Sequence, residues 1–162
     1  MKQQFSFAYT VYDSAEELPA ADKSLLEKAR EATGDAYAPY SRFKVAAAAR
    51  LSDGSLVTAT NQENASYPVG ICAERTLLSA VSALYTGRKI DTIAVSYAGG
   101  GNDNRPVSPC GLCRQTLVEY EERFLQPIRL VLGGQAGPVY VISSCADLLP
   151  LRFTAAHLNS AG

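Results

Sequence analysis

Three cysteines and one glutamate carry the chemistry that this sequence predicts. Cys72 is followed two residues later by Glu74. A Cys-x-x-Cys pair preceded by proline then supplies Cys110 and Cys113. Three thiolates on one metal ion leave a fourth coordination position open, which distinguishes a catalytic zinc site from a closed structural one. The carboxylate of Glu74 would move a proton at that open position, so the pattern predicts a zinc centre with an acid–base group beside it.

Expected helix starts explain how these groups can meet. Cys110 and Cys113 lie three residues apart and share one face of a helix. Cys72 is also expected at a helix start, where the helix dipole lowers a thiol pKa and favours the thiolate. On a regular helix Cys72 and Glu74 would point about 200° apart, so both reach one ion only if Cys72 precedes the first helical turn. Arg75 is placed to donate toward the ligand sulfurs and offset part of their charge.

Simpler interpretations of these residues remain open at this point. A closed structural zinc site would need a fourth ligand, and only Cys145 and His157 are left among the cysteines and histidines. Cys145 has no partner at metal-ligand spacing, and His157 lies in a polar tail. A redox-active Cys-x-x-Cys pair is a second alternative, but it leaves Cys72 and Glu74 without a role. Glu74, taken alone, could also be an acidic residue that only stabilises the first turn of a helix through the helix dipole.

Size and composition predict one globular domain. Its 162 residues are expected to include an N-terminal extension over 1–20 and a C-terminal tail over 154–162. Apolar residues make up 47% and charged residues 19% of the chain, which is typical of a folded protein. A net charge of −1 with scattered basic residues argues against a nucleic-acid or anionic-membrane partner.

The start of the sequence does not have the pattern of a secretory signal. Polar Gln3, Gln4 and Ser6 interrupt the apolar stretch that such a signal needs, and no stretch has the length of a membrane span. A cytoplasmic location is therefore the expectation. Thiols stay reduced there, so a Cys-x-x-Cys pair is more often a metal or redox motif than a disulfide.

The elements that must position the site alternate between helices and strands. Large apolar residues alternate with polar or small ones from Phe5 to Val11, which predicts a short N-terminal strand with one buried face. Ser108 is the expected N-cap of the helix that carries the cysteine pair, and Pro109 its first residue. Helices are expected over 19–33, 72–85 and 109–124, with a short one at 145–149. Strands are expected over 43–51, 55–60, 90–98, 128–132 and 139–142.

Two connections determine strand directions. Ser52-Asp53-Gly54 has the composition of a hairpin turn. Residues 133–138 are too few to hold a crossover helix, so the last two strands should be antiparallel neighbours. The pattern predicts an α/β fold in three layers, α/β/α, with a five-stranded mixed sheet and helices covering both of its faces.

The cysteine motifs and three further segments resemble the zinc-dependent nucleoside deaminases, specifically the small homotetrameric cytidine deaminases of the cytidine/deoxycytidylate deaminase superfamily. The motifs are CAER over 72–75 and SPCGLCRQ over 108–115; the further segments are YSRFKV over 40–45, NQENASY over 61–67 and LLPLRF over 148–153. The zinc deaminase pattern is His-x-Glu followed by Pro-Cys-x-x-Cys, and here Cys72 replaces the histidine. The resemblance runs from Tyr37 to Phe153 and implies a cytidine deaminase-like fold.

The resemblance also implies roles for matching residues. Cys72, Cys110 and Cys113 would bind one Zn²⁺ per chain. Glu74 would shuttle protons in the hydrolytic deamination of cytidine or deoxycytidine, in pyrimidine salvage. Asn61 and Glu63 would bind the ribose hydroxyls, and Phe43 would stack near the pyrimidine. The backbone of Ala73 and Ser108 would bind the edge of the base. Phe153 would reach the site of a neighbouring subunit. A homotetramer acting on a free nucleoside is implied as well.

The chain departs from the family pattern at four places. Ala46 stands where the family usually has glycine, and Pro68 follows the NASY stretch where glycine is frequent. Residues 99–106 are unusually rich in glycine, and about twenty N-terminal residues precede the usual family start. None of these is a proposed catalytic group, but the loops at Pro68 and 99–106 bear on pocket shape and substrate preference.

Alternative functions use the same motifs. A deaminase of a cytosine-containing nucleoside antibiotic would share the whole site. A polynucleotide deaminase would need a basic, aromatic channel for the strand, which the net charge of −1 argues against. An inactive zinc-binding module is the alternative from another class, and the presence of Glu74 argues against it.

Overall fold

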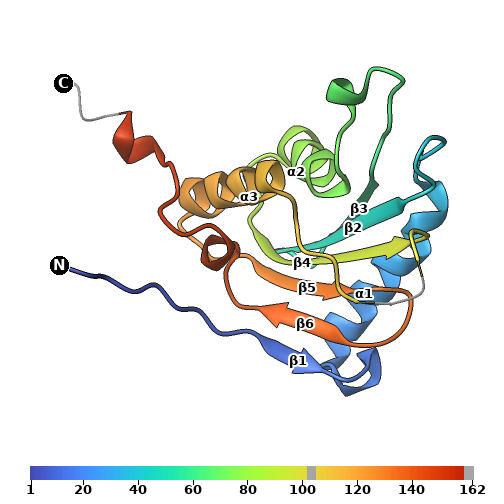
Figure 1. Cartoon of the computed structure of the whole chain (residues 1–162), viewed down its shortest axis with the longest axis horizontal. Coiled ribbons are helices and arrows are strands. Elements are labelled where there is room, and N and C mark those ends of the chain that lie inside the picture. The colour runs from blue at the N-terminus through green and yellow to red at the C-terminus, as the bar shows by residue number, and fades with distance from the viewer. Residues whose placement is uncertain (102–104, 159–162) are drawn as a thin grey trace.

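One mixed β-sheet lies at the centre of the computed structural model, which describes residues 1–101 and 105–158 (Figure 1). Within these residues the sheet has six strands in the order β1-β6-β5-β4-β2-β3. The strands are β1 (Thr10–Tyr12), β2 (Lys44–Leu51), β3 (Leu56–Thr60), β4 (Ile90–Ala98), β5 (Arg129–Gly133) and β6 (Val139–Ile142). The helices are α1 (Ala20–Ala32), α2 (Ala73–Leu84) and α3 (Gly111–Phe124). The predicted α/β class is confirmed, whereas the predicted number of strands is wrong because β1 adds to the edge of β6.

Strand directions follow from the connections. β2 and β3 form the expected antiparallel hairpin, and Gly54 in its turn has a φ of 85°, which favours glycine. β5 and β6 are antiparallel neighbours, as their short connection predicts. β4 and β5 are parallel, and the chain between them is long enough to include the crossover helix α3.

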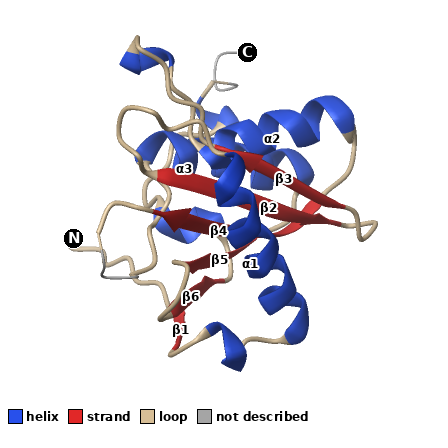
Figure 2. Cartoon of the chain, turned by 90° about the vertical axis from the view of Figure 1, so that its right-hand side faces the viewer, coloured by secondary structure: helices blue, strands red, loops and turns tan. Residues whose placement is uncertain are grey.

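Helices cover both faces of the sheet (Figure 2). Residues 46–49 of β2 are four fully buried alanines, and successive side chains point to opposite faces. Ala48 packs in the cluster with α1, whereas Ala47 and Ala49 pack in the cluster with α2 and α3. These small side chains let helices approach a central strand from both sides. None of the helices in the described parts of the chain has the length and apolarity to cross a membrane.

Helix α3 begins later than expected. Cys110, not Ser108, is its N-cap, with an extended backbone at φ −67° and ψ 170°. Arg114 accounts for the difference: its Nη2 donates to Ser108 Oγ at 3.0 Å and its Nε donates to the Pro109 carbonyl at 2.8 Å. The Ser108 hydroxyl therefore accepts from a side chain instead of capping the helix. The short helix expected at 145–149 is a 3₁₀ turn, η4 (Cys145–Leu148).

The N-terminal strand is shorter and more exposed than expected. β1 has three residues, and the aromatic residues before it lie outside regular structure. Phe5 is 54% and Phe7 45% exposed, so the predicted buried face is wrong. The reason is the position of β1: it occupies the sheet edge beside β6, whereas α2 packs on β2 and β3 near the opposite edge.

Candidate active site

Two helix starts bring the three predicted metal ligands together. The Sγ atoms of Cys72, Cys110 and Cys113 all lie within 4.8 Å of one another. Cys72 Sγ is 3.8 Å from Cys110 Sγ, which is 3.5 Å from Cys113 Sγ. Zn–S bonds of about 2.3 Å in a tetrahedral site place two sulfurs about 3.8 Å apart. The donor set therefore fits Zn²⁺ in both spacing and chemical softness.

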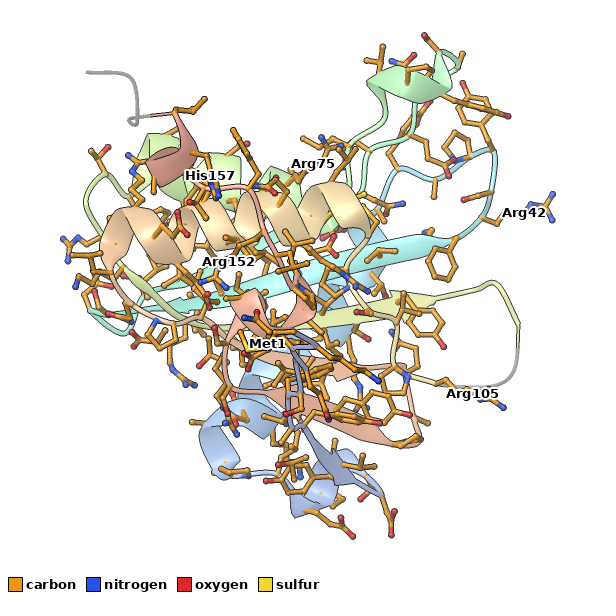
Figure 3. The ribbon with its side chains drawn as sticks, turned by 60° about the vertical axis from the view of Figure 1, so that its left-hand side comes forward. Met1, Arg42, Arg75, Arg105, Arg152 and His157 are labelled. Carbon is orange, nitrogen blue, oxygen red and sulfur yellow. The ribbon has the colours of Figure 1, made fainter. Side chains whose placement is uncertain are left out.

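The remaining cysteine and the histidine lie elsewhere. Cys145 is buried in the core, where its Sγ donates to the Ile128 carbonyl at 3.3 Å. His157 contacts Thr154 and stacks on Phe153. It lies near the C-terminal end of the described chain (Figure 3). Among the described residues, the group of metal-binding side chains is limited to the three cysteines. Neither Cys145 nor His157 therefore joins the three clustered thiols.

Electrostatics within the cluster favour a thiolate at Cys72. A hydrogen bond from the Cys113 thiol lowers the pKa of Cys72 to about 5, with smaller effects from Cys110 and the Arg75 guanidinium. The same hydrogen bond, together with burial, raises the pKa of Cys113. The Cys113 thiol thus donates to the Cys72 sulfur. Metal binding must displace that proton, because thiolates are the ligands.

Arg75 lies on the first turn of α2, on the side of the sheet that α2 and α3 cover (Figure 3). Its Nη2 donates to the Gly70 carbonyl at 3.3 Å. Its buried Nε has no hydrogen-bond partner among the described residues. A buried N–H without an acceptor costs free energy, and a ligand sulfur at Cys72 is an acceptor of the right charge. This donor therefore favours a thiolate at Cys72, the form that binds a metal ion.

Glu74 is a buried carboxylate beside the thiols. It is 5% exposed, and burial raises its pKa, with a further increase from the Cys72 thiolate. Cys72 is the N-cap of α2 with an extended backbone at φ −72° and ψ 153°, so it precedes the first helical turn as expected. This geometry lets both Cys72 and Glu74 line the same cavity.

A cavity of 560 Å³ opens beside the thiols. Its size suits a small organic molecule. Eight of the predicted site residues line it: Phe43, Asn61, Glu63, Cys72, Ala73, Glu74, Ser108 and Cys110. The loop between β3 and α2, which projects from the body of the molecule, supplies much of the wall (Figures 1 and 2). Residues remote in sequence therefore converge on one site.

Glu63 is held by the segment that precedes β2. Its carboxylate accepts from the backbone N–H groups of Tyr40, at 2.8 Å, and Ser41, at 3.3 Å, and from the Ser41 hydroxyl. These hydrogen bonds, the hydroxyl first, lower the pKa of Glu63. The carboxylate is thus ionised at neutral pH and fixed at the cavity wall.

Asn61 is held by the start of β2. Its Oδ1 accepts from the Val45 N–H at 2.9 Å, and its Nδ2 donates to the Phe43 carbonyl at 2.9 Å. A carboxamide has a second lone pair and a second N–H. Asn61 can therefore bind a ligand hydroxyl while keeping its two backbone contacts.

Phe153 does not line the cavity of its own chain. It is 55% exposed, and its carbonyl accepts from Gln115 Nε2 at 2.9 Å. The structure thus separates Phe153 from the other predicted substrate-binding residues.

Sequence reasoning missed the supports of the cavity wall. Arg114 holds Ser108 and Pro109, and its Nη1 also donates to the Leu148 carbonyl at 3.1 Å. Its place directly after Cys113 in the quoted motif was the available signal. Tyr40 and Tyr67 also line the cavity, with ring centroids 5.9 Å apart in an edge-to-face pair.

Comparisons with known proteins all point to one family. Residues 19–125 match the family described as cytidine and deoxycytidylate deaminase zinc-binding region. A cytidine deaminase of Halalkalibacterium halodurans is 41% identical over 137 residues, which are 83% of this chain and 96% of that protein. A cytidine deaminase of Sporosarcina psychrophila is 37% identical, over 86% of this chain and 96% of its own. The crystal structure of cytidine deaminase from Burkholderia pseudomallei matches with a TM-score of 0.69 and 40% identity, over 84% of this chain and 100% of that one.

Proposed function

This chain belongs to the cytidine and deoxycytidylate deaminase family, and from that premise we propose that it deaminates cytidine to uridine and ammonia by hydrolysis, in pyrimidine salvage. Deoxycytidine would give deoxyuridine by the same reaction. One observation carries the proposal: the buried carboxylate of Glu74 and the thiols of Cys72 and Cys110 line one cavity.

The cavity wall supports a nucleoside as the substrate. Its described lining residues include no lysine or arginine, and the Glu63 carboxylate would repel a phosphate group. Glu63 can accept from one ribose hydroxyl, and the Asn61 amide can donate to another. A site built on such pairs rejects a ligand that lacks the hydroxyl, because its own polar groups are left unpaired.

The metal site is assigned to Cys72, Cys110 and Cys113, with one ion per chain. When bound there, Zn²⁺ supplies a water whose pKa is lowered toward neutrality. Arg75 offsets part of the negative charge of the three thiolates. The backbone of Ala73, directly after Cys72, and of Ser108, two residues before Cys110, is assigned to the base edge.

Glu74 handles both protons of the reaction. It takes one from the attacking water and gives it to ring N3 while the water oxygen bonds to C4. It then passes the second to the amino group at C4, so the C–N bond breaks and ammonia leaves. Its burial suits this work because a raised carboxyl pKa makes proton transfer in both directions easier near neutral pH.

Ultraviolet absorbance tests the reaction directly. Zinc-loaded protein should convert cytidine to uridine, and Glu74→Gln should lower kcat by about 10²–10⁴-fold while keeping one zinc per chain. Glu119→Gln, an exposed acid on α3, is the matched control. Zinc-loaded wild type that leaves cytidine and deoxycytidine intact would refute the proposal, and an active Glu74→Gln would refute the role of Glu74.

A homotetramer is part of the proposal. The exposed ring of Phe153, together with Leu112 and Leu158, which are 64% and 68% exposed, supports contact with another copy of the chain. Phe153→Ala should raise KM for cytidine if the ring enters a neighbouring site. Light scattering of the native protein should give four times the 17.3 kDa chain mass; a monomer with full activity would contradict this assignment.

A further inference from the structure

Tyr97 lies behind the wall of the cavity, near the end of β4. It is 8% exposed and pairs with Val45 across the antiparallel β2–β4 ladder. Directly opposed residues share a face of the sheet, as do residues two apart on a strand. Val45 and Val95 line the cavity, so Tyr97 is directed to the same side.

The ring of Tyr97 supports Phe43. Their ring centroids lie 5.2 Å apart with a tilt of 33°. Gly100 restricts the Phe43 ring as well, because a Cβ atom at Gly100 would lie 2.6 Å from Phe43 Cδ2. Phe43 precedes the first residue of β2. Side-chain packing rather than strand pairing therefore fixes this ring at the cavity wall.

The hydroxyl of Tyr97 holds a second part of the wall. It donates to the Arg105 carbonyl at 2.8 Å. Val107 and Ser108, two and three residues later, line the cavity. Arg114 fixes the other end of this short segment through Ser108 and the Pro109 carbonyl. The segment is thus held by one side chain at each end.

We propose that Tyr97 is a positioning residue that sets the affinity of the site for the pyrimidine ring, by holding Phe43 with its own ring and residues 105–108 with its hydroxyl. This inference rests on the proposed function, because Phe43 and Ser108 are assigned to the base. Tyr97 touches no reacting atom. Its removal should therefore change binding much more than chemistry.

Tyr97→Phe removes the hydroxyl and keeps the ring. The lost hydrogen bond should raise KM for cytidine, and the inhibition constant of the product uridine, by roughly two- to tenfold. Both kcat and zinc content should stay within about twofold of wild type. Tyr97→Leu, which also removes the ring from Phe43, should raise KM further.

Tyr120→Phe is a matched control. The Tyr120 hydroxyl donates to the Leu78 carbonyl at 2.7 Å, between α3 and α2, and is likewise partly buried. This variant loses the same kind of hydrogen bond away from the cavity wall. It should lose a similar amount of stability and keep the KM of wild type. Equal KM values for the two phenylalanine variants would overturn the proposal.

Hydrogen exchange gives a readout that does not depend on turnover. The amides of Val107 and Ser108 should exchange faster in Tyr97→Phe than in wild type or Tyr120→Phe. If these amides exchange faster in Tyr97→Phe but the wild-type protein does not convert cytidine, then Tyr97 does hold residues 105–108, and it is the proposed function that is wrong. If neither the amide exchange rates nor the KM for cytidine change in Tyr97→Phe, then Tyr97 does not position the cavity wall and the proposal is wrong.

Discussion

At the scale of single residues, Glu63 shows how a partly exposed carboxylate is fixed at a cavity wall. Three donors from Tyr40 and Ser41 occupy its oxygens before any substrate arrives. They lower its pKa, so the ionised form is favoured. For a carboxylate with a lowered pKa, the stabilising contribution is present above the unfolded pKa and is lost as the pH falls through the folded one.

Glu63→Gln should therefore impair ribose binding. The amide NH₂ cannot accept hydrogen bonds, so one side of the group loses its contacts with the 40–41 segment and the charge is lost. We expect a roughly tenfold or greater fall in kcat/KM for cytidine, mostly through KM. Steady-state kinetics checks this. Asp53→Asn, at the distant β2–β3 turn, is the control. Equal values of kcat/KM in the two variants would show that Glu63 does not bind the ribose.

At the scale of elements, Glu121 joins the end of α3 to two other segments. It is 8% exposed, and its carboxylate accepts from the backbone N–H groups of Ile128 and Cys145, at 2.7 and 2.8 Å. It also accepts from the Ala146 N–H and the Ser144 hydroxyl. One side chain thus ties α3 to the start of β5 and to η4.

Glu121→Ala should strongly destabilise the fold. It leaves the Ile128 N–H without an acceptor and removes one of the two acceptors of the Cys145 and Ala146 N–H groups. An unsatisfied buried donor costs about 1–3 kcal/mol, and the weakened contacts and the lost packing add to it. We expect a loss of roughly 3–5 kcal/mol in the free energy of unfolding, measured by urea denaturation. Glu119→Ala, on the exposed side of the same helix, should stay within about 0.5 kcal/mol of wild type. A small loss for Glu121→Ala would mean that water replaces the missing acceptor.

The bounds of the helices and strands could largely be predicted from the sequence, whereas contacts between distant elements could not. Strand β4 agrees with its expected bounds because its residues form one buried run between turn signals. The spacing of the cysteines and Glu74 along the chain predicts that they lie together, and the structure brings them together. Tyr97, Arg114 and Glu121 were missed because their partners depend on how distant segments pack. The prediction that Phe7 is buried was wrong for a similar reason. Alternation of apolar and polar residues predicts which side chains share a strand face, but not whether a helix covers that face.

At the scale of the whole molecule, the N-terminal segment lines no part of the cavity beside the thiols, although its aromatic residues line a second cavity with Ser108 and Arg114. The family match begins at residue 19, after β1. β1 pairs with β6 along three residues and covers an edge that would otherwise present unpaired backbone groups. Its contribution should therefore be to stability and solubility more than to chemistry.

Truncation of residues 1–13 tests this division. The shortened protein should keep kcat/KM for cytidine within about twofold, whereas its Tm should fall by several degrees and its tendency to aggregate should rise. Removing only residues 1–4 should change neither. Loss of activity at unchanged stability in the longer truncation would instead give the segment a direct role at the site.

The position of Cys72 and Cys110 at two separate helix starts has a consequence for folding. They are 38 residues apart in the chain, so an ion bound to both closes a long loop, as a disulfide would. By the loop-closure relation a covalent link of that length removes entropy from the unfolded chain worth about 4 kcal/mol. Chelation should accordingly lower the melting temperature even of Glu74→Gln, whose activity is already lost. The ion would then act as a reversible cross-link as well as a reagent.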